Sequence, residues 1–78
     1  MKREMRSYLV HRIEAAAKMV EKMREEKNRQ EFLIHSARGE ILLNFFDSFL
    51  DRKDEDAVKE YCYCRNLFAD ARWAMFRD

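Results

Sequence analysis

Two cysteines, Cys62 and Cys64, lie one residue apart and are the only thiols in the chain. Thiolates bind metals and exchange electrons, so a cysteine pair directs attention to zinc or redox chemistry. The Cys-x-Cys spacing differs from the Cys-x-x-Cys spacing that zinc knuckles and thioredoxin-like sites use. On a helix the two thiols would point about 200° apart and could not reach one metal ion. We therefore predict no metal or redox centre here, and we interpret Cys64 as a small buried hydrophobic residue.

Two histidine–glutamate pairs have the spacing of half a metal site. His11 and Glu14 are three residues apart, and Glu31 and His35 are four apart, so each pair shares a helix face. Helical metal proteins with carboxylate ligands combine Glu-x-x-His motifs from two helices with further glutamates, and the sequence has no such second motif. The sequence in fact lacks the Glu-x-x-His motif altogether, since the step from Glu31 to His35 is four residues. It also has no glycine-rich phosphate loop and no nucleophile motif. We predict no catalytic residue, no bound metal and no cofactor, and therefore a protein that is not an enzyme.

The basic residues are concentrated in the first part of the chain. Residues 1–29 hold nine Lys/Arg and five Glu, a balance of +4, whereas residues 30–78 hold seven Lys/Arg and ten Asp/Glu, a balance of −3. A basic first helix could contact phosphates or an acidic partner. The candidates for such contacts are Arg3, Arg6, Lys18, Lys22 and Arg29. Because glutamates are mixed among them and the net charge is only +1, a nucleic-acid-binding helical bundle is the alternative interpretation rather than the preferred one.

The composition favours helices throughout. Proline is absent and glycine occurs once, as Gly39, which leaves too few turn formers for an all-β fold. Three segments place apolar residues at the helical spacing of three or four, and we predict that these stripes form the core. The stripes are Met5, Leu9, Ile13, Ala16, Val20 and Met23; then Ile34, Ala37, Ile41, Phe45 and Phe49, widened by Leu42 and Phe46; and then Ala57, Tyr61, Cys64, Phe68, Ala71 and Met75.

Polar stretches separate the three segments. Residues 24–31 contain no apolar side chain, and two architectures remain open there. Either Asn28 ends the first helix in a left-handed conformation and the chain turns, or one helix runs unbroken from residue 2 to 51. The second break is clearer, because Asp54 can cap a third helix whose first turn carries Glu55 and Asp56.

Aromatic side chains outside the third stripe are candidates for partner contacts. Trp73 and Tyr63 point away from that stripe, and Phe76 and Leu67 lie beside it on opposite sides. Exposed aromatic residues anchor many protein interfaces. We therefore predict that protein binding uses Trp73, Tyr63, Phe76 and Leu67.

These patterns predict an all-α fold in one helical domain, residues 1–78. The preferred architecture is an antiparallel three-helix bundle with helices at 2–27, 30–51 and 54–77, the third of which should touch both others. The alternative is a hairpin of one long and one short helix that dimerises into a four-helix bundle.

A short chain with more apolar surface than a small bundle can bury favours a binding role. We interpret the protein as a small helical protein–protein interaction module, a class that includes regulators and inhibitors of host proteins, acting through an apolar helix face and self-association as a homodimer. The sequence shows no export signal and no apolar run of membrane-spanning length. We therefore expect a cytoplasmic protein with reduced thiols and no membrane contact.

Overall fold

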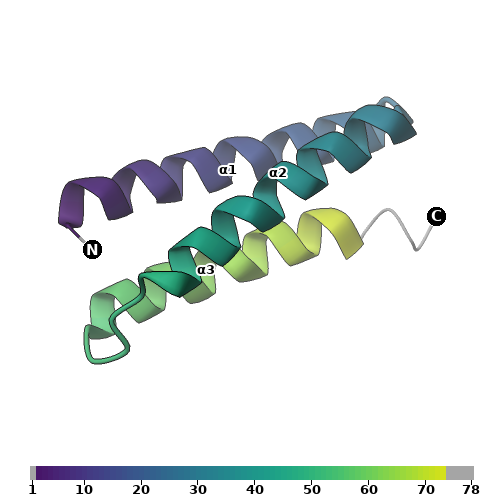
Figure 1. Cartoon of the computed structure of the whole chain (residues 1–78). Coiled ribbons are helices and arrows are strands. Elements are labelled where there is room, and N and C mark those ends of the chain that lie inside the picture. The colour runs from purple at the N-terminus through teal and green to yellow at the C-terminus, as the bar shows by residue number, and fades with distance from the viewer. Residues whose placement is uncertain (1, 74–78) are drawn as a thin grey trace.

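Three α-helices account for most of the chain. The computed structural model describes residues 2–73, with α1 at Arg3–Glu25, α2 at Arg29–Ser48 and α3 at Glu55–Trp73. Consecutive helices run in opposite directions, and α2 passes obliquely in front of α1 and α3 in the view of Figure 1. The predicted all-α antiparallel three-helix bundle is confirmed, and the unbroken helix from residue 2 to 51 is excluded.

The turn between α1 and α2 is built differently from the predicted one. Lys27, not Asn28, takes the left-handed conformation, with φ 57°. The Asn28 backbone N–H donates to the Met23 carbonyl at 2.9 Å, which closes α1 in a Schellman-type turn. The Asn28 side chain meanwhile accepts a hydrogen bond from the Glu31 N–H at 3.2 Å and so begins α2 as its N-cap. The turn itself was predicted correctly, but its left-handed residue was placed one position too late.

The connection between α2 and α3 ends on the predicted cap. Asp54 Oδ1 accepts a hydrogen bond from the Ala57 N–H at 3.2 Å, and Glu55 and Asp56 follow in the first turn of α3. This arrangement satisfies a backbone donor that the helix itself leaves unpaired and puts negative charge at the positive end of the helix dipole. The predicted role of Asp54 is confirmed.

α1 supplies the largest share of the core, and both other helices pack on it. Its buried residues are Leu9, Ile13, Ala16, Ala17, Val20 and Met23, which is the predicted stripe without Met5 and with Ala17 added. The α3 stripe is also confirmed where it is described: Ala57, Cys64, Phe68 and Ala71 are buried, Tyr61 is half-buried, and Met75 lies outside the described residues. α3 touches both other helices, as predicted, but contacts α1 more extensively than α2.

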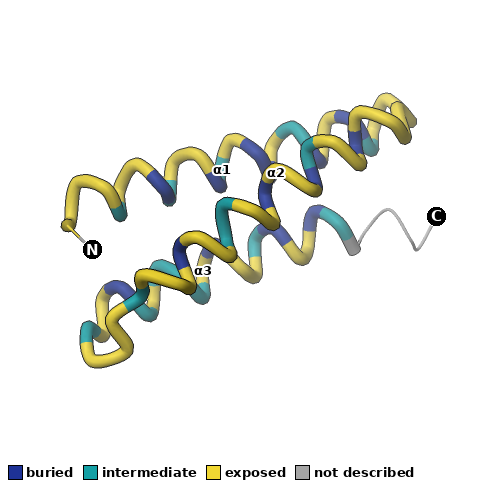
Figure 2. The backbone as a smooth tube through the Cα atoms, in the orientation of Figure 1, coloured by how far each residue is buried: buried dark blue, intermediate teal, exposed yellow. Residues whose placement is uncertain are grey.

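The central stripe predicted for α2 was wrong, because it faces solvent, whereas the two residues predicted to widen it, Leu42 and Phe46, do pack on the core. All five of its members, Ile34, Ala37, Ile41, Phe45 and Phe49, are exposed, and Ile41 is 68% exposed. The buried side of α2 consists instead of Phe32, Ser36, Gly39 and Phe46, with Leu42 and Leu43 packed at its margins. Figure 2 shows α2 as a mostly exposed helix crossed by a few buried positions.

Gly39 explains why the other side of α2 is buried. The Phe68 ring of α3 lies where a Cβ atom on residue 39 would be, with its Cε2 and Cζ atoms closest. Only glycine leaves that space open, so this side of α2 can approach the bundle closely. α2 is apolar on two opposite sides, and the side that carries the small residues Ser36 and Gly39 accommodates the ring. Apolar spacing within one helix cannot distinguish the two sides.

Gly39→Ala should therefore destabilise the protein, by about 1–3 kcal/mol as overpacking substitutions do. At an exposed helical position the same change would stabilise by about 1 kcal/mol through helix propensity, so the sign of the effect tests the packing. Chemical unfolding followed by circular dichroism measures it. In a Phe68→Leu background, where the ring is absent, the penalty should shrink. Stabilisation by Gly39→Ala in the wild-type background would show that the ring does not occupy this space.

Candidate interaction surface

The solvent side of α2 carries no charge along most of its length. We call this surface the α2 outer face; it consists of eight exposed residues, Gln30, Leu33, Ile34, Ala37, Ile41, Asn44, Phe45 and Ser48. At about 100° per residue these side chains span an arc of about 120° around the helix. In a chain whose residues are 40% charged, an exposed arc without a charge is a departure from the usual solvated helix surface.

The charged residues of α2 flank this face, and two of its three carboxylates pair with arginines within the chain. On the side of α1, Glu31 lies 3.6 Å from His35, and Arg38 lines a shallow groove with Arg12 of α1. Towards α3, Glu40 pairs with Arg72 at 2.9 Å, and Asp47 pairs with Arg52 at 3.1 Å. The apolar face is therefore bordered, but not interrupted, by ionic groups.

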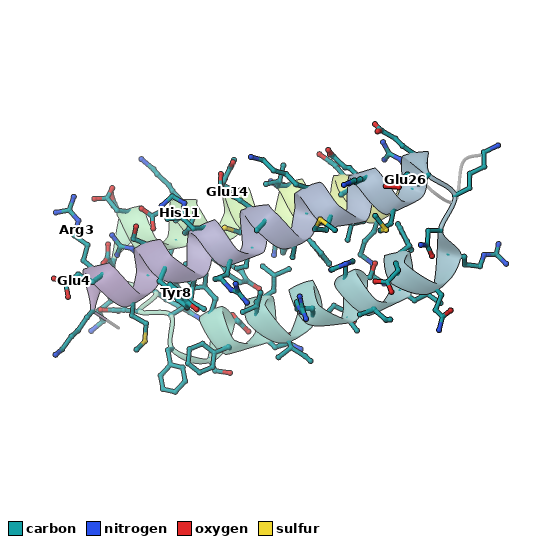
Figure 3. The ribbon with its side chains drawn as sticks, turned by 90° about the horizontal axis from the view of Figure 1, so that it is seen from above. Arg3, Glu4, Tyr8, His11, Glu14 and Glu26 are labelled. Atoms are coloured by element: carbon teal, nitrogen blue, oxygen red, sulfur yellow. The ribbon has the colours of Figure 1, made fainter. Side chains whose placement is uncertain are left out.

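α1 extends the apolar surface at one end. Because α1 and α2 are antiparallel, the start of α1 lies beside the end of α2, where Phe49 lines a pocket with Arg6. Met5 and Tyr8, one helical turn apart, are exposed there by 51% and 61%. Figure 3 shows Tyr8 on the side of α1 that faces α2, while Glu14 lies on the opposite side. The Phe45 and Phe49 rings pack against each other with centroids 4.9 Å apart, so the surface ends in an aromatic cluster.

The exposed apolar side chains are as numerous as the buried ones. Among residues 2–72, eight large hydrophobic side chains are exposed, and seven Leu, Ile, Val, Met or Phe side chains are buried. The exposed set is Met5, Tyr8, Leu33, Ile34, Ile41, Phe45, Phe49 and Tyr63. Single exposed hydrophobic residues are ordinary, but a contiguous set on one helix is typical of a contact surface.

The two predicted protein-binding residues whose side chains the structure describes, Tyr63 and Leu67, lie away from the α2 outer face. Tyr63 is exposed, and its hydroxyl donates to Glu14 Oε2 at 2.8 Å; this hydrogen bond to a carboxylate raises the pKa of Tyr63. Leu67 is half-buried and packs against the core cluster that contains Phe68. The Trp73 side chain and Phe76 lie outside the described residues. The structure brings neither Tyr63 nor Leu67 onto the α2 outer face, and their role in binding stays a prediction.

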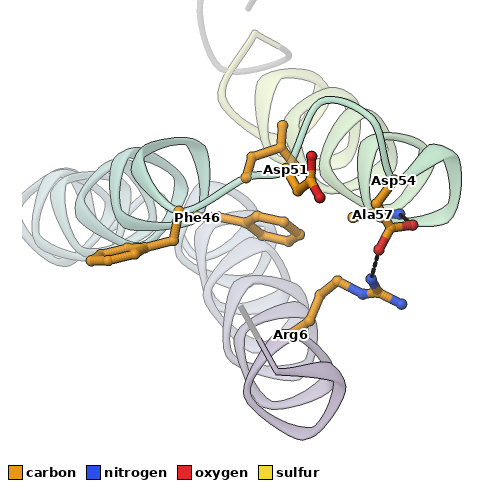
Figure 4. Close-up of a pocket in the computed structure, with 7 residues that line it drawn as sticks. Arg6, Phe46, Asp51, Asp54 and Ala57 are labelled. Atoms are coloured by element: carbon orange, nitrogen blue, oxygen red, sulfur yellow. Dashed lines mark hydrogen bonds and ion pairs between the residues drawn. The ribbon is translucent and has the colours of Figure 1, made fainter.

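The five predicted cationic contacts divide into two kinds. Arg3, Lys18, Lys22 and Arg29 are exposed. Arg6 is engaged within the chain: its Nη1 lies 3.0 Å from Asp54 Oδ2 and its Nε lies 2.8 Å from Glu60 Oε2, with the side chain 12% exposed. Figure 4 shows the Arg6 guanidinium directed at Asp54 beside the Phe46 ring. Arg6 thus joins the first turns of α1 and α3.

The contacts of the Asp54 carboxylate should make the stability of the fold depend on pH. The hydrogen bond from the Ala57 N–H, and beyond it the charge of Arg6, hold the pKa of Asp54 below its ordinary value of 3.8, although partial desolvation opposes them. A carboxyl whose pKa is lower in the folded state stabilises the fold above its ordinary pKa. That contribution is lost as the pH falls through the folded-state pKa.

The wild-type melting temperature should therefore fall between about pH 5 and pH 2 more steeply than that of Asp54→Asn. Asparagine preserves the N-cap but cannot titrate or pair with Arg6. Melting curves at matched ionic strength across this range measure the difference. A parallel pH profile for the two proteins would mean that the Asp54 contacts do not persist in solution.

The two thiols have different surroundings. Cys64 is fully buried, and this burial raises its pKa to about 12, which confirms its interpretation as a hydrophobic core residue. Cys62 is only half-buried. Within residues 2–73 no three His, Cys, Asp or Glu side chains are grouped closely enough to hold a metal ion. His11 and Glu14 form a simple pair at 3.5 Å.

An aromatic disulfide reagent should modify Cys62 at least roughly a hundredfold faster than Cys64 in the native protein near neutral pH, because only exposed thiolate reacts. The Cys62→Ser and Cys64→Ala variants each keep one thiol. Their absorbance traces show which thiol reacts in the fast phase and which in the slow phase. Both thiols should react at similar rates in denaturant. Fast modification of Cys64 in the folded Cys62→Ser protein would contradict its burial.

The sequence did not predict that the α2 outer face is exposed together with Met5 and Tyr8. The apolar residues of this face, and Met5 in α1, have the same spacing as a buried stripe. A signal for the true orientation was present in the sequence. Ser36 and Gly39 lie on the opposite side of the same helix, and a glycine inside an apolar helix often marks a close approach by another side chain.

Within residues 2–73, none of the three helices is apolar over enough of its length to cross a lipid bilayer. Comparison with protein-family models, with curated proteins and with solved structures finds no significant match to this chain.

Proposed function

We propose that this protein is a small helical protein–protein interaction module whose contact surface is the α2 outer face together with Met5 and Tyr8. The observation that carries the proposal is the uncharged apolar arc of α2, exposed along the helix in a highly charged chain. Burying apolar surface is worth roughly 25 cal/mol per Å², so covering this face is favourable. Self-association and the regulation or inhibition of a host protein are both roles that such a module serves by occupying a surface.

The residues around the face support a protein partner more than a nucleic acid. A phosphate-binding surface needs free cations in a row, whereas Arg6 of the predicted set is held by Asp54 and Glu60. The remaining members of α1, such as Lys18 and Lys22, alternate with Glu21 and Glu25. Binding through the apolar face should change little with salt, while phosphate contacts weaken steeply.

Ile41→Glu should abolish association without unfolding the protein. Ile41 is the most exposed of the large hydrophobic residues, so a charge there costs little in the free chain. A carboxylate buried in an apolar contact is strongly unfavourable, and we expect affinity to fall by about 100-fold or more. The readouts are molar mass by light scattering and retention of proteins from a lysate, each compared with the wild type.

The matched control is Asn66→Glu, which adds the same charge at an exposed position of α3 and should leave association intact. Circular dichroism must show equal helicity for all three proteins. If the wild type neither self-associates nor retains a partner, or if Ile41→Glu behaves like Asn66→Glu, the α2 outer face is not the contact surface.

A further inference from the structure

We propose that the occupant of the α2 outer face is the same face of a second copy of this chain, with the two α2 helices antiparallel about a two-fold axis at Ile41. This inference rests on the proposed function, because it assumes that the face is a protein contact. It adds the identity of the partner, the direction of the pairing and the residue at its centre.

The absence of charge on the face favours a second copy. A face with charged residues of one sign would repel itself and would call for a partner of opposite charge, but the α2 outer face contains none. The neighbouring carboxylates of Glu31, Glu40 and Asp47 are each paired within their own chain. Among residues 2–73, Arg29 and Arg38 flank the face without an ion pair, and Arg38 is the nearer of the two to the face. In the proposed pairing it lies about 9 Å along the helix axis from the partner's Arg38, the rise of six residues.

Side-chain size is complementary in the antiparallel direction. With the axis at Ile41, Ala37 lies level with the partner's Phe45, and Ile34 lies level with the partner's Ser48. A small side chain thus meets a large one in both of these layers, which is the pattern that fills an interface without gaps. A parallel pairing would instead set Phe45 against Phe45 and Ala37 against Ala37, crowding one layer and leaving a void in the other.

The available area matches what a stable dimer needs. Seven outward side chains are each roughly half exposed: Met5, Tyr8, Leu33, Ile34, Ile41, Phe45 and Phe49. A whole aromatic side chain presents about 150–250 Å², so each contributes on the order of 100 Å². Together they offer on the order of 700 Å² per copy, close to the roughly 800 Å² per partner of a standard interface.

Cysteine cross-linking tests both the partner and the direction. In a Cys62→Ser background, Ile41→Cys should form an intermolecular disulfide under mild oxidation, because two residues at the axis can approach within the roughly 4.4–6.8 Å between Cα atoms that a disulfide spans. Ile34→Cys and Phe45→Cys should each fail alone, since their symmetry mates lie about 21 Å and 12 Å away along the axis. Mixing Ala37→Cys with Phe45→Cys should restore cross-linking between the two chains.

Light scattering of the unmodified protein should give twice the 9.6 kDa chain mass, and Ile41→Glu should raise the dimer dissociation constant by about 100-fold or more, because the substitution occurs twice at the axis. A monomer that captures another protein in an Ile41-dependent way would overturn the second-copy inference and leave the proposed function standing. Equal cross-linking of the Ile41→Cys, Ile34→Cys and Phe45→Cys variants, each tested alone, would overturn the antiparallel pairing. A dimer insensitive to Ile41→Glu would overturn both proposals.

Discussion

The contact between the Phe68 ring and the backbone of Gly39 determines the rest of the architecture. The ring fills the space that any larger residue at position 39 would occupy, and it belongs to the core cluster that also holds Val20 and Phe32. Through this one aromatic side chain all three helices meet. Burying a phenylalanine is worth several kcal/mol, a large part of the margin available to so short a chain. The orientation of α2 follows from this contact, because only one side of α2 can receive the ring.

That orientation has a consequence on the opposite side of the helix. α2 carries apolar residues on two opposite sides that are separated by charged flanks, so turning Gly39 inward turns Ile41 and its neighbours outward. A helix that is apolar on two sides is typical of an element buried on both sides. Within residues 2–73 only one side of α2 is covered, and the α2 outer face is the side left exposed. The proposed binding role and the proposed dimer both follow from this imbalance.

Polar interactions position the helix ends without deciding which faces meet. Asn28 and Asp54 each cap a helix by accepting a backbone hydrogen bond, and Lys27 supplies the left-handed turn between α1 and α2. Arg6 then joins the starts of α1 and α3 through two carboxylates. These contacts keep the connections short and the helices antiparallel, so the apolar residues of α2 are presented on a rigid element.

The sequence alone determined the helical class, the Asp54 cap and most of the buried stripes of α1 and α3, because each depends on local spacing and local hydrogen bonding. It left open whether the chain turns within residues 24–31 or continues there as one helix. It did not determine which side of α2 is buried. Both sides satisfy helical spacing, and the choice is made by Phe68, a residue 29 positions further along the chain whose ring fits against Gly39. The candidate surface, formed by Met5, Tyr8 and the outer residues of α2, became visible only once that long-range packing was known.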